Sequence, residues 1–350
     1  MISEYIKNSE YRKALSLPAE MTETYILLAQ GEYNVNYLFA HPVTGRKLIL
    51  RVNTGSQMHL DRQIEYEAHA LDLLSGSGRT PKVLFVDGSK AFIEFGVLVM
   101  EYLTGRYPSY ESSADMSGVM KCMADIHSVA IPSEEVIYGE PFGKDAVPRD
   151  TVRLIAPGSA SGSILDECES MLKVYMDSPL GDMSVKERLR RLLDRGHEIA
   201  GKGDEETAVT RCCINTELNS TNFLVDDSGF VKLVDWEKPL YGDPAQDLGH
   251  LLAPTTTFWK TDTVLSAGDT DGLINEYLEA VDGRYDTCGI SERIKRLITI
   301  TCLRGLTWCA MAWVEYQDPE KLIANESTRK KLDAYLSDSF LKDIEKRFGL

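Results

Sequence analysis

The sequence predicts an α+β protein of two lobes, a small β-rich lobe followed by a large helical one. The 350 residues exceed the length at which a single hydrophobic core usually keeps growing. Apolar runs of strand length crowd the first hundred residues, whereas beyond Gly105 the apolar residues recur at helical spacing. We place the small lobe at residues 1–102, with a helical leader over 1–20, and the large lobe at residues 103–350.

The first lobe is expected to be a sheet with one helix inserted. Strands over 25–29 and 37–40 form a hairpin, and a third strand follows a turn at 41–46. The helix ends at Gly76-Ser77-Gly78. The remaining elements are a third strand over 47–52, a helix over 60–74, and strands over 82–86 and 97–101.

The second lobe is expected to be mainly helical. A region of short strands over 209–234 interrupts it. Helices are predicted over 116–129, 184–199, 272–281 and 291–316.

Bulk composition limits the classes of partner. A net charge of −16 argues against nucleic acid, because phosphate backbones require a basic surface. The acidic balance suits a cationic small molecule and equally suits plain solubility. The N-terminus lacks the apolar core of a signal peptide, and no stretch approaches the ~20 apolar residues of a membrane span. The seven cysteines form no C-x-x-C pair, so we expect reduced thiols, a cytoplasmic location and no membrane partner.

A hairpin in the second lobe carries the most informative polar residues. Asp226–Gly229 is a turn between two apolar runs, so Phe223–Val225 and Phe230–Val234 should pair antiparallel. That pairing places Asn222 and Asp235 side by side at the open end of the hairpin. Both side chains offer oxygen, the ligand that Mg²⁺ prefers, so a magnesium site is predicted there. Glu217 lies five residues before Asn222 and can reach the same space; the alternative is a polar loop with ordinary turn carboxylates.

The helix of the first lobe carries a carboxylate on its apolar stripe. Glu67 falls within the stripe, whereas Glu65 points away. A buried carboxylate needs a cationic partner, and Arg51 at the end of an apolar strand is the candidate. The alternative is a solvated helix glutamate. The stripe consists of Leu60, Ile64, Leu71 and Leu74.

Residues 215–248 resemble the catalytic and metal-binding loops of the aminoglycoside phosphotransferase and choline kinase family. That family has H-x-D-x-x-x-x-N, a hairpin, I-D-W/F and then G-D-P-x-x-D-L, which Gly242–Leu248 matches. Two positions depart: Asn215 stands where the family has His, and Glu217 where it has the catalytic Asp. The resemblance implies a bilobal protein-kinase-like fold and binding of ATP with Mg²⁺. It also makes Asn222 and Asp235 the metal ligands.

Other roles follow from the resemblance. Arg51 would hold nucleotide phosphates and Glu67 would orient Arg51. Asp247 would brace the catalytic loop, while His127 is expected to be a core histidine. Residues 306–316 match an aromatic helix that could enclose a quaternary ammonium or simply fill the core. The remaining nucleotide contacts are Gly31 and Asn34 in the turn over the phosphates, and Glu101, Tyr102 and Leu103 in the hinge to adenine.

The function expected from these residues is an ATP-dependent phosphotransferase. It would move the γ-phosphate to a hydroxyl of a small molecule that is aminoglycoside-, choline- or sugar-like and possibly cationic. Glu217 would orient or deprotonate that hydroxyl, since glutamate carries the same carboxylate as aspartate on one more methylene. The alternatives are a nucleotide-binding pseudokinase, marked by Asn215 and Glu217, or an enzyme that transfers a different part of the nucleotide.

Overall fold

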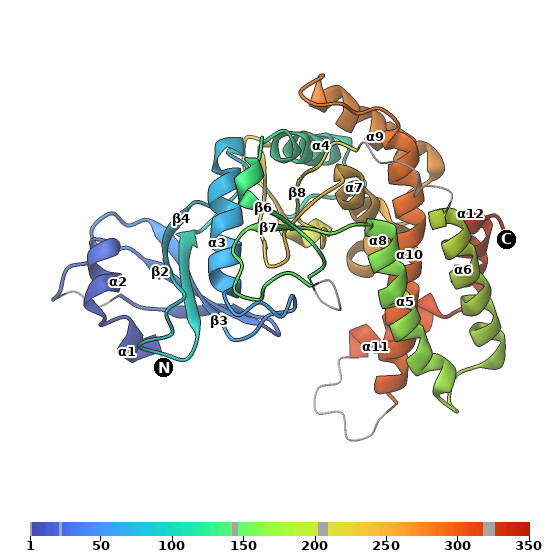
Figure 1. Cartoon of the computed structure of the whole chain (residues 1–350), viewed down its shortest axis with the longest axis horizontal. Coiled ribbons are helices and arrows are strands. Elements are labelled where there is room, and N and C mark those ends of the chain that lie inside the picture. Colours follow the sequence, from blue (N-terminus) through green and yellow to red (C-terminus); the bar gives the residue numbers. More distant parts are fainter. Residues whose placement is uncertain (1, 21–22, 142–145, 202–208, 318–325) are drawn as a thin grey trace.

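A five-stranded antiparallel sheet forms the N-terminal part of the structure, a computed structural model that describes residues 2–20, 23–141, 146–201, 209–317 and 326–350. The strand order is β1-β2-β3-β5-β4, so β3 is the central strand and β5 lies beside it (Figure 1). The central strands are mostly buried, as their apolar sequences require. The strands are β1 (Ile26–Gln30), β2 (Asn34–Ala40), β3 (Lys47–Asn53), β4 (Val83–Asp87) and β5 (Gly96–Glu101).

Helices cover both faces of this sheet. Val97 and Val99 of β5 belong to one apolar cluster with Tyr5 and Tyr11, which the short helices α1 (Ile2–Tyr5) and α2 (Ser9–Ala14) supply. Leu98 and Met100 belong to a second cluster that contains the apolar side of α3 (Gln63–Leu73). The alternation along β5 follows from the two-residue period of a strand. The helix α3 therefore lies between the sheet and the rest of the chain.

The C-terminal part is helical and is built around α10, the long helix on the right of Figure 1. Short strand pairs, β8 with β11 and β9 with β10, carry the loops that face the sheet. The α-helices are α4 (Ser113–His127), α5 (Ala160–Asp177), α6 (Met183–Gly201), α7 (Pro244–Leu252), α8 (Pro254–Thr261), α9 (Ala267–Val281), α10 (Ile290–Glu315), α11 (Glu326–Tyr335) and α12 (Asp338–Phe348). The short strands are β6 (Val136–Tyr138), β7 (Leu154–Ala156), β8 (Cys212–Ile214), β9 (Phe223–Val225), β10 (Val231–Leu233) and β11 (Leu240–Gly242).

The α+β class is confirmed, as is each predicted strand and helix to within a few residues. The helices α5, α7, α8, α11 and α12 were not predicted. The first turn of α5 is the polar and small-residue stretch Ala160–Ser163. Its apolar side emerges only from Ile164 onward and packs on α10. Six of the seven cysteines are buried, and Cys288 is exposed.

The helix α10 is long and apolar enough, by length and composition, to cross a membrane. In this fold, 56% of its most apolar window is buried inside the structure. A buried core helix passes the same test, so the hydropathy of α10 reflects its place at the centre of the helical part.

Helices α7 and α10 touch backbone to backbone at Gly249. A Cβ atom at Gly249 would lie 2.7 Å from the Cβ atom of Leu297 and 3.0 Å from its carbonyl carbon. We therefore expect Gly249→Ala to lower the free energy of unfolding by about 1–3 kcal/mol through overpacking. Urea unfolding monitored by circular dichroism measures it.

The matched control is Gly272→Ala in α9, where a Cβ atom meets nothing within 4 Å. That change should leave the stability unchanged or raise it by up to about 1 kcal/mol, since alanine is the better helix former. Equal effects of the two substitutions would contradict the close approach of α7 to α10.

Candidate active site

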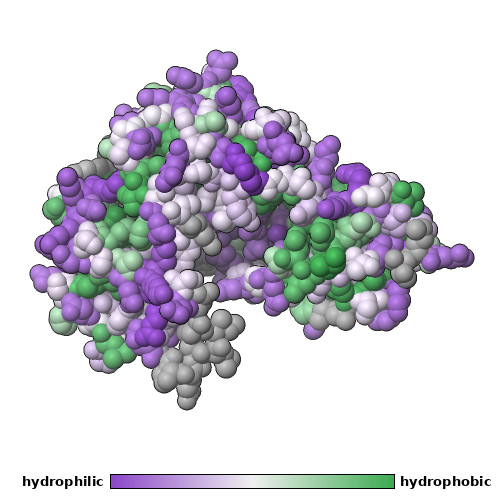
Figure 2. Space-filling model, turned by 180° about the vertical axis from the view of Figure 1, so that it is seen from behind, coloured by the Kyte–Doolittle hydropathy of each residue, from purple (hydrophilic) through white to green (hydrophobic). Residues whose placement is uncertain are grey.

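A cleft of about 860 Å³ separates the sheet from the helical part. The surface is visibly hollowed between the two parts when the molecule is seen from behind (Figure 2). Strands β1 to β3 and helix α3 form one wall, and the loops around β9 and β10 form the other. Residues of both walls that bear on the chemistry are Gly31, Asn34, Arg51, Glu67, Asn222, Asp235 and Glu237.

Arg51 is the buried cation at the centre of this cleft. Its Nη1 lies 2.5 Å from Oε1 of Glu67, the partner that the apolar stripe of α3 predicts. Its Nε donates to Oδ1 of Asn36 at 2.9 Å. Nη2 lies 3.6 Å from the carboxylate of Asp235, and Nη1 lies 3.9 Å from that of Glu237. Arg51 thus connects the sheet, α3 and the loop that follows β10.

Three carboxylates surround this one guanidinium, and the surplus negative charge is visible in the pKa values. Burial alone would lower the pKa of Arg51, but Glu67, Asp235 and Glu237 raise it above its usual value. Burial, followed by the charge of Asp235, raises the pKa of Glu237 to about 7, and Arg51 opposes the shift. The group as a whole favours the arrival of another cation.

Sequence reasoning missed Glu237. The strand period could not have placed it, because β10 ends at Leu233 and Asp235 is left-handed. In the structure Trp236 is buried, while Asp235 and Glu237 both line the cleft.

The hairpin that was predicted to carry the metal ligands is formed by β9 and β10. Phe223 pairs with Leu233, and the N–H of Val234 donates to the carbonyl of Asn222 at 2.8 Å. Asp235 then adopts a left-handed conformation with φ +67°, which Asp tolerates better than most residues. Both Asn222 and Asp235 line the cleft, as the pairing requires.

This donor set fits Mg²⁺ held largely by phosphate. Asn222 and Asp235 offer oxygen atoms, and Mg²⁺ in phosphoryl-transfer sites commonly takes one or two protein carboxylates plus phosphates and water. Within the described ranges, no three His, Cys, Asp or Glu side chains converge as an independent metal site. The ion would therefore arrive with the nucleotide.

The loop before the hairpin is fixed by a fully buried carboxylate. Asp247 on α7 accepts the N–H of Asn215 at 2.8 Å and that of Thr216 at 2.7 Å. Nε2 of His127 lies 3.2 Å from the same carboxylate, and Nδ1 of His127 lies 2.7 Å from the hydroxyl of Tyr277. His127 is thus a buried histidine that supports Asp247, as expected for a core histidine.

Thr216 shows how firmly this loop is held. Its φ of +72° is an outlier for a β-branched residue and costs on the order of 1–3 kcal/mol. The bond from its N–H to Asp247 and the bond from its Oγ1 to the carbonyl of Lys238 at 2.8 Å fix this conformation. Thr216 directly precedes Glu217, so its fixed conformation sets the direction of the backbone at Glu217.

Asn215, which stands where the family has His, joins the two loops of the site. Its Nδ2 donates to the carbonyl of Asp235 at 2.7 Å, and its Oδ1 accepts the N–H of Glu217 at 3.2 Å. Asn215 therefore holds the loop before β9 and the segment after β10 together through neutral hydrogen bonds.

The side chain of Glu217 lines a second cavity rather than the cleft that holds Asn222. Its Oε1 accepts from Nε2 of Gln57 at 3.1 Å and lies 3.9 Å from Nζ of Lys238 and 4.0 Å from Nη2 of Arg304. Its backbone carbonyl accepts from Nδ2 of Asn222 at 3.2 Å. A hydrogen bond therefore links Glu217 and Asn222, although their side chains line two different cavities.

This second cavity has a volume of about 350 Å³ and an aromatic wall. Trp308 of α10 is 39% exposed and meets Trp259 edge-on, with ring centroids 5.3 Å apart. Trp313 of the same helix packs on Tyr175 instead. Of the two tryptophans in the predicted aromatic helix, only Trp308 lines this cavity, and Trp259 of α8 supplies the partner that the sequence did not reveal.

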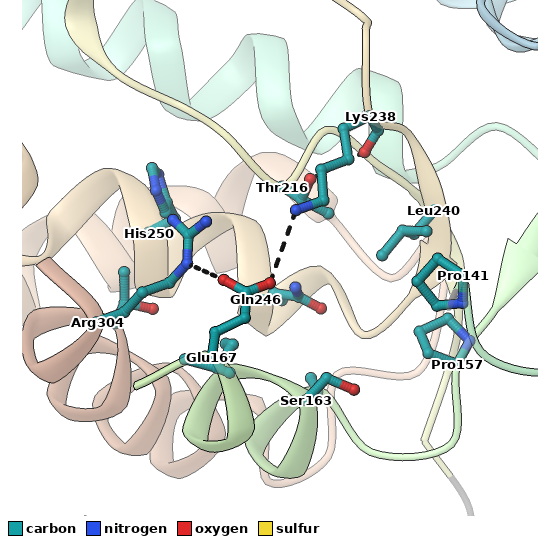
Figure 3. A pocket seen from close by; sticks show the side chains of 13 residues that line it. Pro141, Pro157, Ser163, Glu167, Thr216, Lys238, Leu240, Gln246, His250 and Arg304 are labelled. Atoms are coloured by element: carbon teal, nitrogen blue, oxygen red, sulfur yellow. Dashed lines mark hydrogen bonds and ion pairs between the residues drawn. The ribbon is translucent and has the colours of Figure 1, made fainter. Parts of the chain in front are cut away.

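A cluster of charges that sequence reasoning also missed borders Glu217. Figure 3 shows Arg304 and Lys238 reaching Glu167 of α5 from opposite sides. Nε of Arg304 lies 2.6 Å from Oε2 of Glu167 and Nζ of Lys238 lies 3.9 Å from Oε1. Burial would raise the pKa of Glu167, but the two cations hold it below its usual value. No local pattern connects these residues, which come from α5, α10 and the segment after β10.

Of the three residues expected in the hinge to the nucleotide base, two line the cleft and one does not. Tyr102 and Leu103 line the cleft, whereas Glu101 does not; its side chain turns toward Arg46, 4.0 Å away. The N–H groups of Glu101 and Tyr102 are already bonded to the carbonyls of residues 82 and 47. Only the Leu103 N–H of the three expected hinge donors is therefore left for a base, within the described chain.

The glycine turn lies over the cleft as predicted. The N–H of Gly31 donates to the carbonyl of Asn34 at 2.9 Å, and both residues line the cavity. The side chain of Asn34 is buried and bonded to Nδ2 of Asn53 at 3.0 Å, so it shapes the turn.

Comparison with known proteins agrees with this geometry. The family described as the phosphotransferase enzyme family matches residues 24–284, which include the sheet, both loops, Glu167 and Lys238 but not Arg304. The chain belongs to this family. No curated protein sequence matches the chain.

Solved structures of family members share the fold at low sequence identity. A spectinomycin phosphotransferase in complex with ADP and spectinomycin is 11% identical, with a TM-score of 0.60 and coverage of 94% of this chain and 93% of the other. The choline kinase LicA from Streptococcus pneumoniae is 17% identical, with a TM-score of 0.57 and 99% coverage of both chains. An amicoumacin kinase in complex with AMP-PNP and Ca²⁺ is 16% identical, with a TM-score of 0.60 and coverage of 99% and 95%.

The contact between Arg51 and Glu67 predicts energetic coupling in nucleotide binding. Removing Arg51 leaves the buried Glu67 carboxylate without its cation, and removing Glu67 takes away the nearest of the three carboxylates around Arg51. We expect a double-mutant cycle with Arg51→Met and Glu67→Gln to show a coupling of about 1 kcal/mol or more in ATP affinity. Calorimetry measures it. A cycle with exposed Arg62 and Glu65, paired on the outer side of α3, is the control and should show no effect on affinity; additive effects of Arg51 and Glu67 would contradict the assignment.

Proposed function

We propose that this family member is an ATP-dependent phosphotransferase that moves the γ-phosphate to a hydroxyl group of a small molecule. The observation that carries the proposal is the hydrogen bond from the Asn222 side chain to the Glu217 carbonyl. This bond connects the cleft lined by Asn222 with the second cavity, which the Glu217 side chain lines. The larger cleft contains the predicted nucleotide and magnesium residues, and the smaller cavity contains the Glu217 carboxylate. A phosphoryl group would pass where the two chambers meet.

The roles of the residues follow from their positions. Arg51 binds nucleotide phosphates from the floor of the cleft, and Glu67 fixes its orientation. Asn222 and Asp235 would hold Mg²⁺, which would supply positive charge to neutralise the phosphates. Glu217 orients the acceptor hydroxyl. Because positioning dominates phosphoryl transfer, the rigid loop around Thr216 is the main contribution of this chain to the rate.

The second cavity supports an acceptor of small-molecule size. Relatives include enzymes whose structures contain spectinomycin or that are named choline kinases. Here Trp308 and Trp259 offer apolar ring surface, while Glu217 and Arg304 place one charge of each sign on the wall. An aminoglycoside-, choline- or sugar-like compound with a free hydroxyl suits such a wall.

The test of this function is the magnesium dependence of nucleotide binding. ATP should bind more tightly with Mg²⁺ than without it, and Asp235→Ala should remove that difference while leaving the fold intact. Isothermal titration calorimetry measures both affinities. Asp227→Ala, which removes an exposed carboxylate of the same hairpin, is the control and should behave as wild type.

Equal affinity of ATP with and without Mg²⁺ would contradict the metal assignment. ADP formation should then be followed across a panel of hydroxyl compounds that includes aminoglycosides, choline and sugars. A protein that binds magnesium ATP and phosphorylates no member of a broad panel would instead be a pseudokinase, the function that Asn215 and Glu217 would then mark.

A further inference from the structure

Two side chains on one face of α7 form hydrogen bonds with the catalytic loop, one before Glu217 and one after it. Asp247 and His250 are three residues apart and so lie on the same face of the helix. Asp247 accepts hydrogen bonds from the backbone N–H groups of Asn215 and Thr216, which precede Glu217. His250 lies after it, with Nδ1 2.6 Å from the carbonyl oxygen of Leu218. The sequence reading assigned His250 no role.

The bond to Leu218 determines the tautomer of His250. A carbonyl oxygen can only accept a hydrogen bond, so Nδ1 must carry the proton. In a neutral imidazole, Nε2 then has a free lone pair. His250 is half-buried and lines both the acceptor cavity and the smaller cavity of Figure 3. Among the described residues, none forms a hydrogen bond with Nε2.

The surroundings of His250 favour this neutral form. Burial lowers the pKa of His250 below its usual value, and the positive charge of Arg304 on α10 lowers it further. The carbonyl of Leu218 and the carboxylates of Glu217 and Asp247 act in the opposite direction and are outweighed. A histidine with a depressed pKa is neutral at pH 7 and gains its proton only when the pH falls below about 6.5.

We propose that Nε2 of His250 accepts the proton of the acceptor hydroxyl, while Glu217 orients that hydroxyl. The inference rests on the proposed function and assigns the catalytic base within it. Glu217 and His250 line the same cavity, and Oε1 of Glu217 already accepts from Gln57. The loop thus keeps a carboxylate for orientation, and the adjacent helix supplies a base.

The step balances with these groups alone. The acceptor oxygen forms a bond to the γ-phosphorus, and the bond from that phosphorus to the β,γ-bridging oxygen breaks, with its electron pair leaving on ADP. The hydroxyl proton passes to Nε2 of His250 and produces an imidazolium whose Nδ1–H remains on the Leu218 carbonyl. The imidazolium returns its proton to solvent when the products leave.

A pair of substitutions separates this role from a structural one. His250→Asn places an amide N–H near the position of Nδ1 and keeps the bond to Leu218, but it removes Nε2. A histidine that only holds the loop would tolerate this change. We expect His250→Asn to bind magnesium ATP and to melt as wild type does, with turnover reduced by about 10²–10⁴-fold. His250→Gln, which extends an amide toward the position of Nε2, should be equally slow because an amide is no base.

The rate is measured as ADP formation from magnesium ATP with water as acceptor, which requires no identified substrate. Wild type should lose activity as the pH falls below about 6.5, and this acid limb should be absent from the residual activity of His250→Asn. Wild-type turnover in His250→Asn would overturn the proposal, and so would an unchanged acid limb.

An NMR spectrum tests the tautomer of His250 independently of turnover. It remains a test of the proposal even if the wild type releases no ADP with water as acceptor. Long-range ¹H–¹⁵N spectra distinguish a protonated from an unprotonated ring nitrogen, and His250→Asn identifies the signal among the six histidines. We expect a neutral ring with an unprotonated Nε2 at pH 7. A charged ring, or a proton on Nε2, would overturn the proposal. Failure of magnesium ATP to bind would instead contradict the proposed function and leave this spectrum valid.

Discussion

The arrangement of the site depends on the carboxylate of Asp247. Its two oxygens receive the N–H groups of Asn215 and Thr216 in a fully buried position, where leaving either group unpaired would cost about 1–3 kcal/mol. His127 of α4 supports the same carboxylate, and His127 is in turn bonded to Tyr277 of α9. The catalytic loop is therefore tied to three helices rather than to its own sequence neighbours.

The rigidity of this loop explains how one short segment serves two chambers. Thr216 holds a strained conformation. The next residue, Glu217, then directs its side chain into the cavity beside Trp308 and its carbonyl toward Asn222. On the nucleotide side, three carboxylates share Arg51, which leaves surplus negative charge for a metal ion to neutralise. In the cavity that Glu217 lines, Arg304 and Lys238 balance the carboxylates of Glu167 and Glu217, so the two chambers differ in charge.

Local patterns were sufficient for much of this structure. The strands, the hairpin that joins Asn222 to Asp235, and the pairing of Arg51 with Glu67 could be predicted because each follows from periodicity or from the need to compensate a buried charge. Glu101 stays a prediction as a nucleotide contact through its backbone; its N–H donates to the carbonyl of Lys82, a pairing that the sequence of the hinge does not reveal.

The acceptor side could not be predicted in the same way. Glu167, Arg304 and His250 lie on three different helices, and only tertiary packing brings them to one cavity. The approach of α7 to α10 at Gly249 brings His250 near Arg304, and a glycine within a helix gives no sequence signal of that contact. The second tryptophan of the cavity, Trp259, was missed for the same reason.

Amide hydrogen exchange at Asn215 and Thr216 tests most directly whether Asp247 holds the catalytic loop. Asp247→Asn keeps the shape of the side chain but replaces one accepting oxygen with an amide group that cannot accept. We predict slow exchange of both amides in the wild type and fast exchange of at least one in Asp247→Asn, with the amides of α10 unchanged. Equal protection of Asn215 and Thr216 in the two proteins would contradict it.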